Sequence, residues 1–294
     1  MKIVRCSNSS IDSYKFCPFQ YYLHYIMEIE TSKGKSAAIG NIVHRTFEWM
    51  AQLKKKNKIN VDPIWLYDRA WDMYPHKDLR KHTTRGESAD YKKTKEIINR
   101  IVDDENYNPY KLNVIQAEKW FEIDLPGEDF EVNDNGVKKQ LRVRGFIDLI
   151  HEIDKDTIEI VDWKSGKRDS PFDSTNMDFY GLSKKLQGGL YYLASILLYP
   201  QYKNRIVTFY YIADGGPTTI GLDETDVPII LSRLYEYFRK IKKDSFVRRN
   251  RSWKCKLCGY NKNDVCSKVW SDYNTFDEKF VKEKYYKVSL ENIK

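Results

Sequence analysis

Two aspartates and a lysine lie close together near the middle of the sequence, in the stretch VRGFIDLIHEIDKDTIEIVDWKSGK. Asp148 is in its first half, and Asp162 and Lys164 are two residues apart in its second half. Two carboxylates and an ammonium group that converge would suit a hard divalent cation and an attacking water. The alternative is a surface hairpin whose charges are only solvated.

The elements that must position these three side chains are two predicted β-strands, Leu141–Ile150 and Thr157–Lys164, joined by a polar connection. Both strands are rich in branched and aromatic residues. Because side chains alternate across a strand, Asp162 and Lys164 share one face. A hairpin would bring Asp148 beside Asp162. Asp and Lys are poor strand formers, and Asp162 comes just after the apolar residues Ile158, Ile160 and Val161. An acid at such a position in a sheet indicates a partner or a function.

A predicted helix after this hairpin, from about Gly181 to Leu198, carries Gln187 and Tyr191. Residues four apart share a helix face, so an amide and a phenol could hold phosphate oxygens or a water next to the acids. The alternative is a tyrosine in the core and a glutamine on the surface.

A histidine on an earlier predicted helix, Ala37–Lys56, could supply a third metal ligand. This residue, His44, follows Gly40 by one turn on the same face. The glycine lacks a side chain and would let the helix approach the sheet closely. Most isolated histidines on helices are structural, so the position alone indicates little.

Four of the five cysteines have the spacing of a metal site. Cys255 and Cys258 form a C-x₂-C pair and Cys266 follows, while Cys17 is the best candidate for the fourth ligand and Cys6 is the odd one out. Four thiolates can hold either tetrahedral zinc or an iron–sulfur cluster. The alternative is free buried thiols, although a Lys-rich segment does not have core patterning. Either metal would link the two ends of the chain.

The composition predicts a soluble globular protein. Of the 294 residues, 41% are hydrophobic and 31% are charged. No apolar run approaches the ~20 residues that span a bilayer, so we expect a cytoplasmic protein without a membrane partner. The net charge of +8 favours polyanionic partners. The absence of a Walker A motif indicates that this chain has no ATP-driven helicase motor.

The order of predicted elements favours one α/β domain over residues 1–294, with a mixed central β-sheet flanked by helices. Residues 50–110 would be a helical elaboration, and residues 250–270 would join Cys17 in a metal-cluster module. The other predicted elements are helices within Ser7–Met27, broken at Pro18, strands at Val114–Leu125 and Arg205–Ala213, and an amphipathic helix at Glu224–Lys243.

Five short motifs appear in the order found in PD-(D/E)XK nucleases of the RecB-like branch, which the chain therefore resembles. They are Gly40-x-x-x-His44, Gly145-x-x-Asp148, Asp162-x-Lys164, Gln187-x-x-x-Tyr191 and the split cysteine set. The cysteines are similar to those of the iron–sulfur subgroup, which includes the AddB nuclease domain and the small nucleases of CRISPR spacer acquisition. The last two cysteines are further apart than is usual there. The resemblance covers Ser9 to Cys266.

The resemblance implies a restriction-endonuclease-like fold and a Mg²⁺- or Mn²⁺-dependent deoxyribonuclease. His44, Asp148, Asp162 and the backbone carbonyl of Trp163 would be the metal ligands. Lys164 would orient the attacking water and stabilise charge on the phosphorane. The remaining assigned positions would be supporting or binding residues: Gln187 and Tyr191 for the active site and the DNA, and Cys17, Cys255, Cys258 and Cys266 for a [4Fe–4S] cluster, with zinc as the weaker alternative.

Basic residues Arg248, Arg249 and Arg251 could contact the DNA backbone, although charge runs are more often solvated surface. We expect an exonuclease that acts on DNA ends or single strands in recombination, repair or replication, alone or with a helicase or recombinase. The alternatives are a CRISPR-type DNA-processing nuclease and a non-catalytic DNA-binding subunit of a helicase–nuclease complex.

Overall fold

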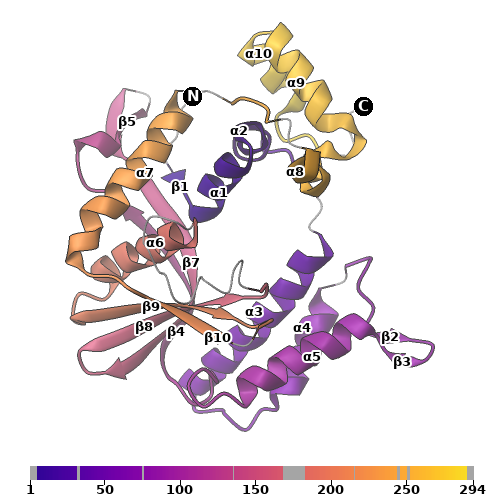
Figure 1. Ribbon diagram of the computed structural model, residues 1–294, viewed down its shortest axis with the longest axis vertical. Coiled ribbons are helices and arrows are strands. Elements are labelled where there is room, and N and C mark those ends of the chain that lie inside the picture. The colour runs from indigo at the N-terminus through magenta and orange to yellow at the C-terminus, as the bar shows by residue number, and fades with distance from the viewer. Residues whose placement is uncertain are drawn as a thin grey trace. The chain divides into compact units, whose positions relative to one another are not determined.

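The computed structural model describes residues 5–31, 34–74, 76–134, 136–167, 183–214, 216–243, 246–249 and 252–289 (Figure 1). The chain divides into two compact units. The cysteine unit consists of Met1–Ser32, Asp124–Val143 and Leu231–Lys294, and the sheet unit of Lys33–Ile123 and Arg144–Ile230. Within the described residues, no helix is both long and apolar enough to cross a membrane. The organisation of residues 1–294 as one nuclease domain stays a prediction.

The sheet unit is built on a mixed β-sheet, as the sequence predicts. Its strands are β4 (Asn113–Asp124), β7 (Arg142–Asp154), β8 (Thr157–Lys164), β9 (Asn204–Tyr211) and β10 (Gly216–Gly221). They lie in the order β7, β8, β9, β10, and β4 pairs with β7. The β7–β8 and β9–β10 pairs are antiparallel and the β8–β9 pair is parallel. The register that pairs Leu149 with Val161 brings Asp148 next to Asp162.

Helices cover both faces of this sheet (Figure 1). The helices α3 (Lys35–Lys55), α4 (Pro63–Met73) and α5 (Ala89–Val102) share one hydrophobic cluster with β7, β8 and β9, and α6 (Ser183–Leu198) follows β8. Trp163 of β8 packs on Phe47 of α3, with ring centroids 4.9 Å apart. Its neighbour Asp162 instead bonds to Gln187 of α6. Since neighbouring strand residues point to opposite faces, α3 and α6 lie on opposite sides of β8.

Three local predictions differ from the structure. Strand β7 runs on to Asp154, so the connection to β8 is shorter than expected and the register shifts between Glu152 and Asp154. Strand β10 was not predicted, because its Gly216-Pro217 start has the composition of a turn. Proline is tolerated there because Pro217 is on the last strand in the order. The helical elaboration also contains a small hairpin of β2 (His82–Thr83) and β3 (Gly86–Glu87).

The cysteine unit is mainly helical. Its elements are β1 (Arg5–Cys6), α1 (Asn8–Phe16), α2 (Pro18–Tyr21), a π-helical turn Tyr22–Ile26, β5 (Glu131–Asp134), β6 (Val137–Gln140), most of α7 (Val227–Lys242), α8 (Ser252–Leu257), α9 (Val265–Thr275) and α10 (Glu278–Tyr285). The predicted break at Pro18 is confirmed, since α1 ends at Phe16 and α2 begins at Pro18. The charged segment at the end of the chain was not predicted to be helical. It forms α10, which buries Val281 and Tyr285.

Candidate active site

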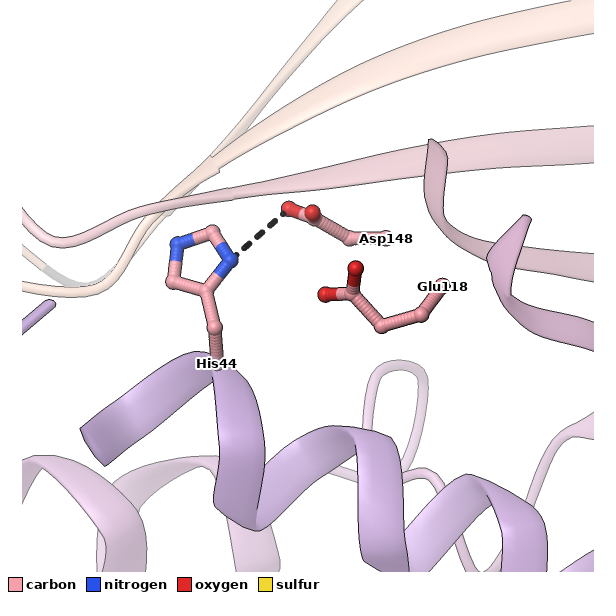
Figure 2. Close-up of side chains that lie close together, drawn as sticks. All are labelled: His44, Glu118 and Asp148. Carbon is pink, nitrogen blue, oxygen red and sulfur yellow. Dashed lines mark ion pairs between the residues drawn. The ribbon is translucent and has the colours of Figure 1, made fainter. Parts of the chain in front are cut away.

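His44 and Asp148 are brought together by a close approach of α3 to the sheet. A Cβ atom at Gly40 would lie 3.2 Å from Ser165 Oγ, so a larger residue there would require the serine side chain to shift. One turn later, His44 Nδ1 lies 3.3 Å from Asp148 Oδ2 (Figure 2). The same carboxylate oxygen accepts a 2.8 Å hydrogen bond from the backbone amide of Trp163. This bond holds Asp148 against β8.

Glu118 is a functional candidate that the sequence did not identify. It lies within β4, and one ligand atom each from His44, Glu118 and Asp148 lie within 4.8 Å of one another. Figure 2 shows its carboxylate and that of Asp148 close to the imidazole. Glu118 has a φ of +46°, which costs a non-glycine residue roughly 1–2 kcal/mol. Such strain persists where the surroundings impose it, often at functional sites. The strand also contains Gln116, Lys119 and Glu122, so its composition did not single out Glu118.

Asp162 and Lys164 form the second part of the site. Lys164 Nζ lies 2.5 Å from Asp162 Oδ2 and donates a 2.8 Å hydrogen bond to Gln187 Oε1. The other oxygen of Asp162 accepts hydrogen bonds from Gln187 Nε2 at 2.9 Å and from the Tyr191 hydroxyl at 2.7 Å. The two residues of α6 therefore face the acid, as their spacing predicts. Asp162 is 3% exposed and bonds to these partners. It is not one of the three residues, His44, Glu118 and Asp148, whose ligand atoms lie within 4.8 Å of one another.

The surroundings shift the pKa values of the two aspartates in opposite directions. Burial alone would raise the pKa of Asp148, but His44, the Trp163 amide and Lys164 lower it below its usual value. Burial raises the pKa of Asp162, and the charge of Asp148 adds to the rise against the opposing effect of Lys164. Burial and both acids hold the pKa of Tyr191 well above its usual value, so its hydroxyl stays protonated and donates to Asp162.

The donor set fits a divalent metal ion. His44, Glu118 and Asp148 line a cavity of about 440 Å³ together with Arg45 and Phe146. Carboxylate oxygens suit Mg²⁺ and Mn²⁺, and an added imidazole favours the softer Mn²⁺. The ring of Trp163 is buried against Phe47, which fixes the backbone at that position, and its carbonyl stays a predicted ligand.

The charge state of His44 leads to a prediction about metal affinity. Burial would lower the pKa of His44, but Asp148, Asp162 and Glu118 together raise it to about 9. A metal can bind this nitrogen only after the proton leaves. We therefore expect the apparent affinity for Mn²⁺ to rise with pH, by up to about tenfold per unit below pH 9. Calorimetric titration between pH 7.5 and 8.5 measures this slope.

Glu118 also titrates near neutral pH, because burial and the nearby acids Asp148 and Glu48 raise its pKa to about 7. The His44→Ala variant is the control, since it removes the imidazole and keeps Glu118. We expect the Mn²⁺ affinity of this variant to rise much less steeply with pH above pH 7.5. A wild-type affinity that stays constant over this interval contradicts the assignment of His44.

The four predicted cluster cysteines lie around one cavity of the cysteine unit. This cavity is lined by Cys17, Cys255, Cys258 and Cys266, with Phe16 and Leu23 among its other walls. Cys17 lies between α1 and α2, and Phe19 of α2 packs on Trp270 of α9 with ring centroids 4.8 Å apart. Burial raises the pKa of Cys266 to about 11 and also raises that of Cys258.

The predicted DNA-contacting arginines have partners beside this cavity. Arg248 donates a hydrogen bond to Ser267 Oγ at 3.0 Å, and Arg249 donates to the backbone carbonyl of Lys15 at 2.9 Å. Both line the cysteine cavity. Arg251 lies outside the described residues. Their role in DNA binding stays a prediction.

Comparisons with known proteins bear on the fold and the family of the chain. No curated protein matches the sequence. Among solved structures, the chain is similar to a protein from Eubacterium rectale that carries the provisional name of an exonuclease, with 17% identity, a TM-score of 0.55 and 88% of each chain covered. A structure named SSO0001 has 12% identity and a TM-score of 0.29, and covers 83% of this chain and 92% of its own. At these identities the first likeness concerns the fold.

The sequence profile of one nuclease family spans most of the chain. It matches residues 5–266, which include both parts of the site and all the cysteines. The chain belongs to the PD-(D/E)XK nuclease superfamily.

Proposed function

We propose that the protein is a Mg²⁺- or Mn²⁺-dependent deoxyribonuclease, an exonuclease that hydrolyses phosphodiester bonds at DNA ends or in single strands. The observation that carries this proposal is the convergence of His44, Asp148 and Glu118 beside the Asp162–Lys164 pair. Membership of a nuclease superfamily supports hydrolysis as the reaction. The basic charge of the chain favours a polyanionic substrate.

Each residue of the site has a distinct proposed role. His44, Asp148 and Asp162 are metal ligands, with Glu118 as an additional donor that the geometry suggests. A bound divalent ion would neutralise a non-bridging phosphate oxygen and lower the pKa of a water. Lys164 pairs with Asp162 and donates a hydrogen bond to Gln187, so its ammonium group is suited to stabilise negative charge on the phosphorane and to orient the attacking water.

Gln187 and Tyr191 position the Asp162–Lys164 pair. Gln187 accepts a hydrogen bond from Lys164 and donates one to Asp162, so one amide fixes both charged groups. Tyr191 donates to the same oxygen of Asp162 and leaves the other oxygen to Lys164. When the lysine moves toward the phosphate, these two bonds would keep Asp162 in place.

The proposal includes a [4Fe–4S] cluster on the four cysteines. All four cysteines line one cavity of the cysteine unit, which supports their assignment to one metal centre. Four thiolates can hold either tetrahedral zinc or an iron–sulfur cluster. The resemblance of the split cysteine set to the iron–sulfur subgroup favours the cluster.

Digestion of end-labelled DNA tests the proposed activity. Single- and double-stranded substrates are incubated with the protein in Mg²⁺, in Mn²⁺ or in EDTA. We expect shortening from an end that requires a divalent ion, and the position of the label reports the polarity. Binding of DNA without cleavage in either metal would contradict the proposal and favour a non-catalytic DNA-binding subunit.

A further inference from the structure

Two aromatic side chains lie exposed beside the candidate active site. Trp120 of β4 and Phe146 of β7 have ring centroids 4.9 Å apart, and they are 44% and 51% exposed. Trp120 is two residues after Glu118, and Phe146 is two residues before Asp148. Two residues span only about 6.6 Å of a strand. Phe146 also lines the cavity that contains His44, Glu118 and Asp148.

This pair is not required to fill the core. The next residues along each strand, Phe121 and Ile147, are 3% and 0% exposed and pack inside the sheet unit. Trp120 and Phe146 therefore place large apolar surface in solvent at the edge of a charged cavity. Contiguous exposed aromatic surface usually marks a binding site.

The neighbouring groups define the chemistry of the ligand. A flat apolar platform lies next to a site suited to a phosphate-bound metal ion, so the ligand should carry a planar apolar group close to a phosphate. A nucleotide has both. We propose that Trp120 and Phe146 form a stacking platform for an unpaired base within one or two nucleotides of the scissile phosphate. This inference rests on the proposed function, for which it specifies the substrate as single-stranded DNA.

The preference for single strands follows from the geometry of stacking. Both faces of a base inside a duplex are covered by its neighbours, so the base must leave the helix before a protein ring can contact it. Unpaired bases present their faces freely, and aromatic side chains bind them with little dependence on sequence.

An abasic scan tests the platform. Labelled single-stranded oligonucleotides carry one abasic site at successive positions from the end, and their affinity is measured by fluorescence anisotropy without added divalent ions. Stacking of one base changes affinity by roughly 5- to 150-fold. We expect wild-type affinity to fall about tenfold for an abasic site at one or two adjacent positions. Trp120→Ala and Phe146→Ala should bind the intact strand about tenfold more weakly and lose this position dependence.

Trp65→Ala is the matched control. Trp65 is 54% exposed on α4 and does not line the cavity, so this variant should keep the wild-type pattern. Trp120→Leu and Phe146→Leu retain apolar surface on the strands and remove only the ring, which separates stacking from loss of folding. The proposal would be overturned if the folded leucine variants kept the position dependence of the wild type. It would also be overturned if the affinity of the wild type did not change with an abasic site at any position.

Cleavage of the same oligonucleotides in Mg²⁺ separates this proposal from the proposed function. Base-dependent binding without cleavage would leave the platform intact and refute the nuclease activity. Cleavage that is insensitive to abasic sites and to both rings would leave the nuclease intact and refute the platform.

Discussion

Replacing Asp162 with asparagine is expected to slow DNA cleavage by at least about 10³-fold. The substitution preserves shape but removes the charge that Lys164 contacts at 2.5 Å. It also removes a proposed metal ligand from a buried position. A single-turnover assay with excess protein measures the effect on the chemical step.

The control for this variant is another buried acid on the same strand. Glu159 is 7% exposed on β8 and bonds to His151 and Thr208 instead of the site. Glu159→Gln should reduce stability and leave the cleavage rate of the folded protein within about tenfold of wild type. Equal rates for Asp162→Asn and wild type would show that Asp162 is not catalytic.

The second large effect is expected at the cysteines. Replacing Cys255 with serine should abolish the visible absorbance of an iron–sulfur cluster and destabilise the cysteine unit. Cys17 and Cys255 are far apart in sequence, so a shared cluster constrains the unfolded chain as a cross-link does, which is worth on the order of 4 kcal/mol for a long loop. Absorbance spectra, iron content and thermal unfolding measure both consequences.

Cys6→Ser is the matched control for the cluster, because Cys6 lies on β1 and does not line the cysteine cavity. This variant should keep the absorbance and the iron content of the wild type. A colourless wild-type protein that contains stoichiometric zinc would overturn the choice of a [4Fe–4S] cluster.

The sequence predicts the parts of the site that depend on local periodicity. Alternation along β8 places Asp162 and Lys164 together, and helical spacing places Gln187 and Tyr191 on one face of α6. The mixed α/β architecture also follows from the order of apolar runs, and the break at Pro18 follows from the chemistry of proline.

The rest of the site depends on tertiary structure. Glu118 lies close to His44 and Asp148 at a point where β4 has a left-handed φ, which no periodicity predicts. The pairing of Trp120 with Phe146 depends on the register between β4 and β7. Strand β10 was missed because its Gly216-Pro217 start favours a turn in isolation, and only pairing with β9 makes it a strand.

The most direct test of the central claim, that this pocket holds a divalent ion against the scissile phosphate, is cleavage of DNA with a sulfur in place of one non-bridging oxygen. Each stereoisomer is digested in Mg²⁺ and in Mn²⁺, next to unmodified DNA. We predict that one isomer is cleaved much more slowly in Mg²⁺ and that Mn²⁺ restores much of the rate, because Mn²⁺ accepts the softer sulfur ligand more readily. Equal slowing in both metals for both isomers would contradict contact between the ion and the phosphate.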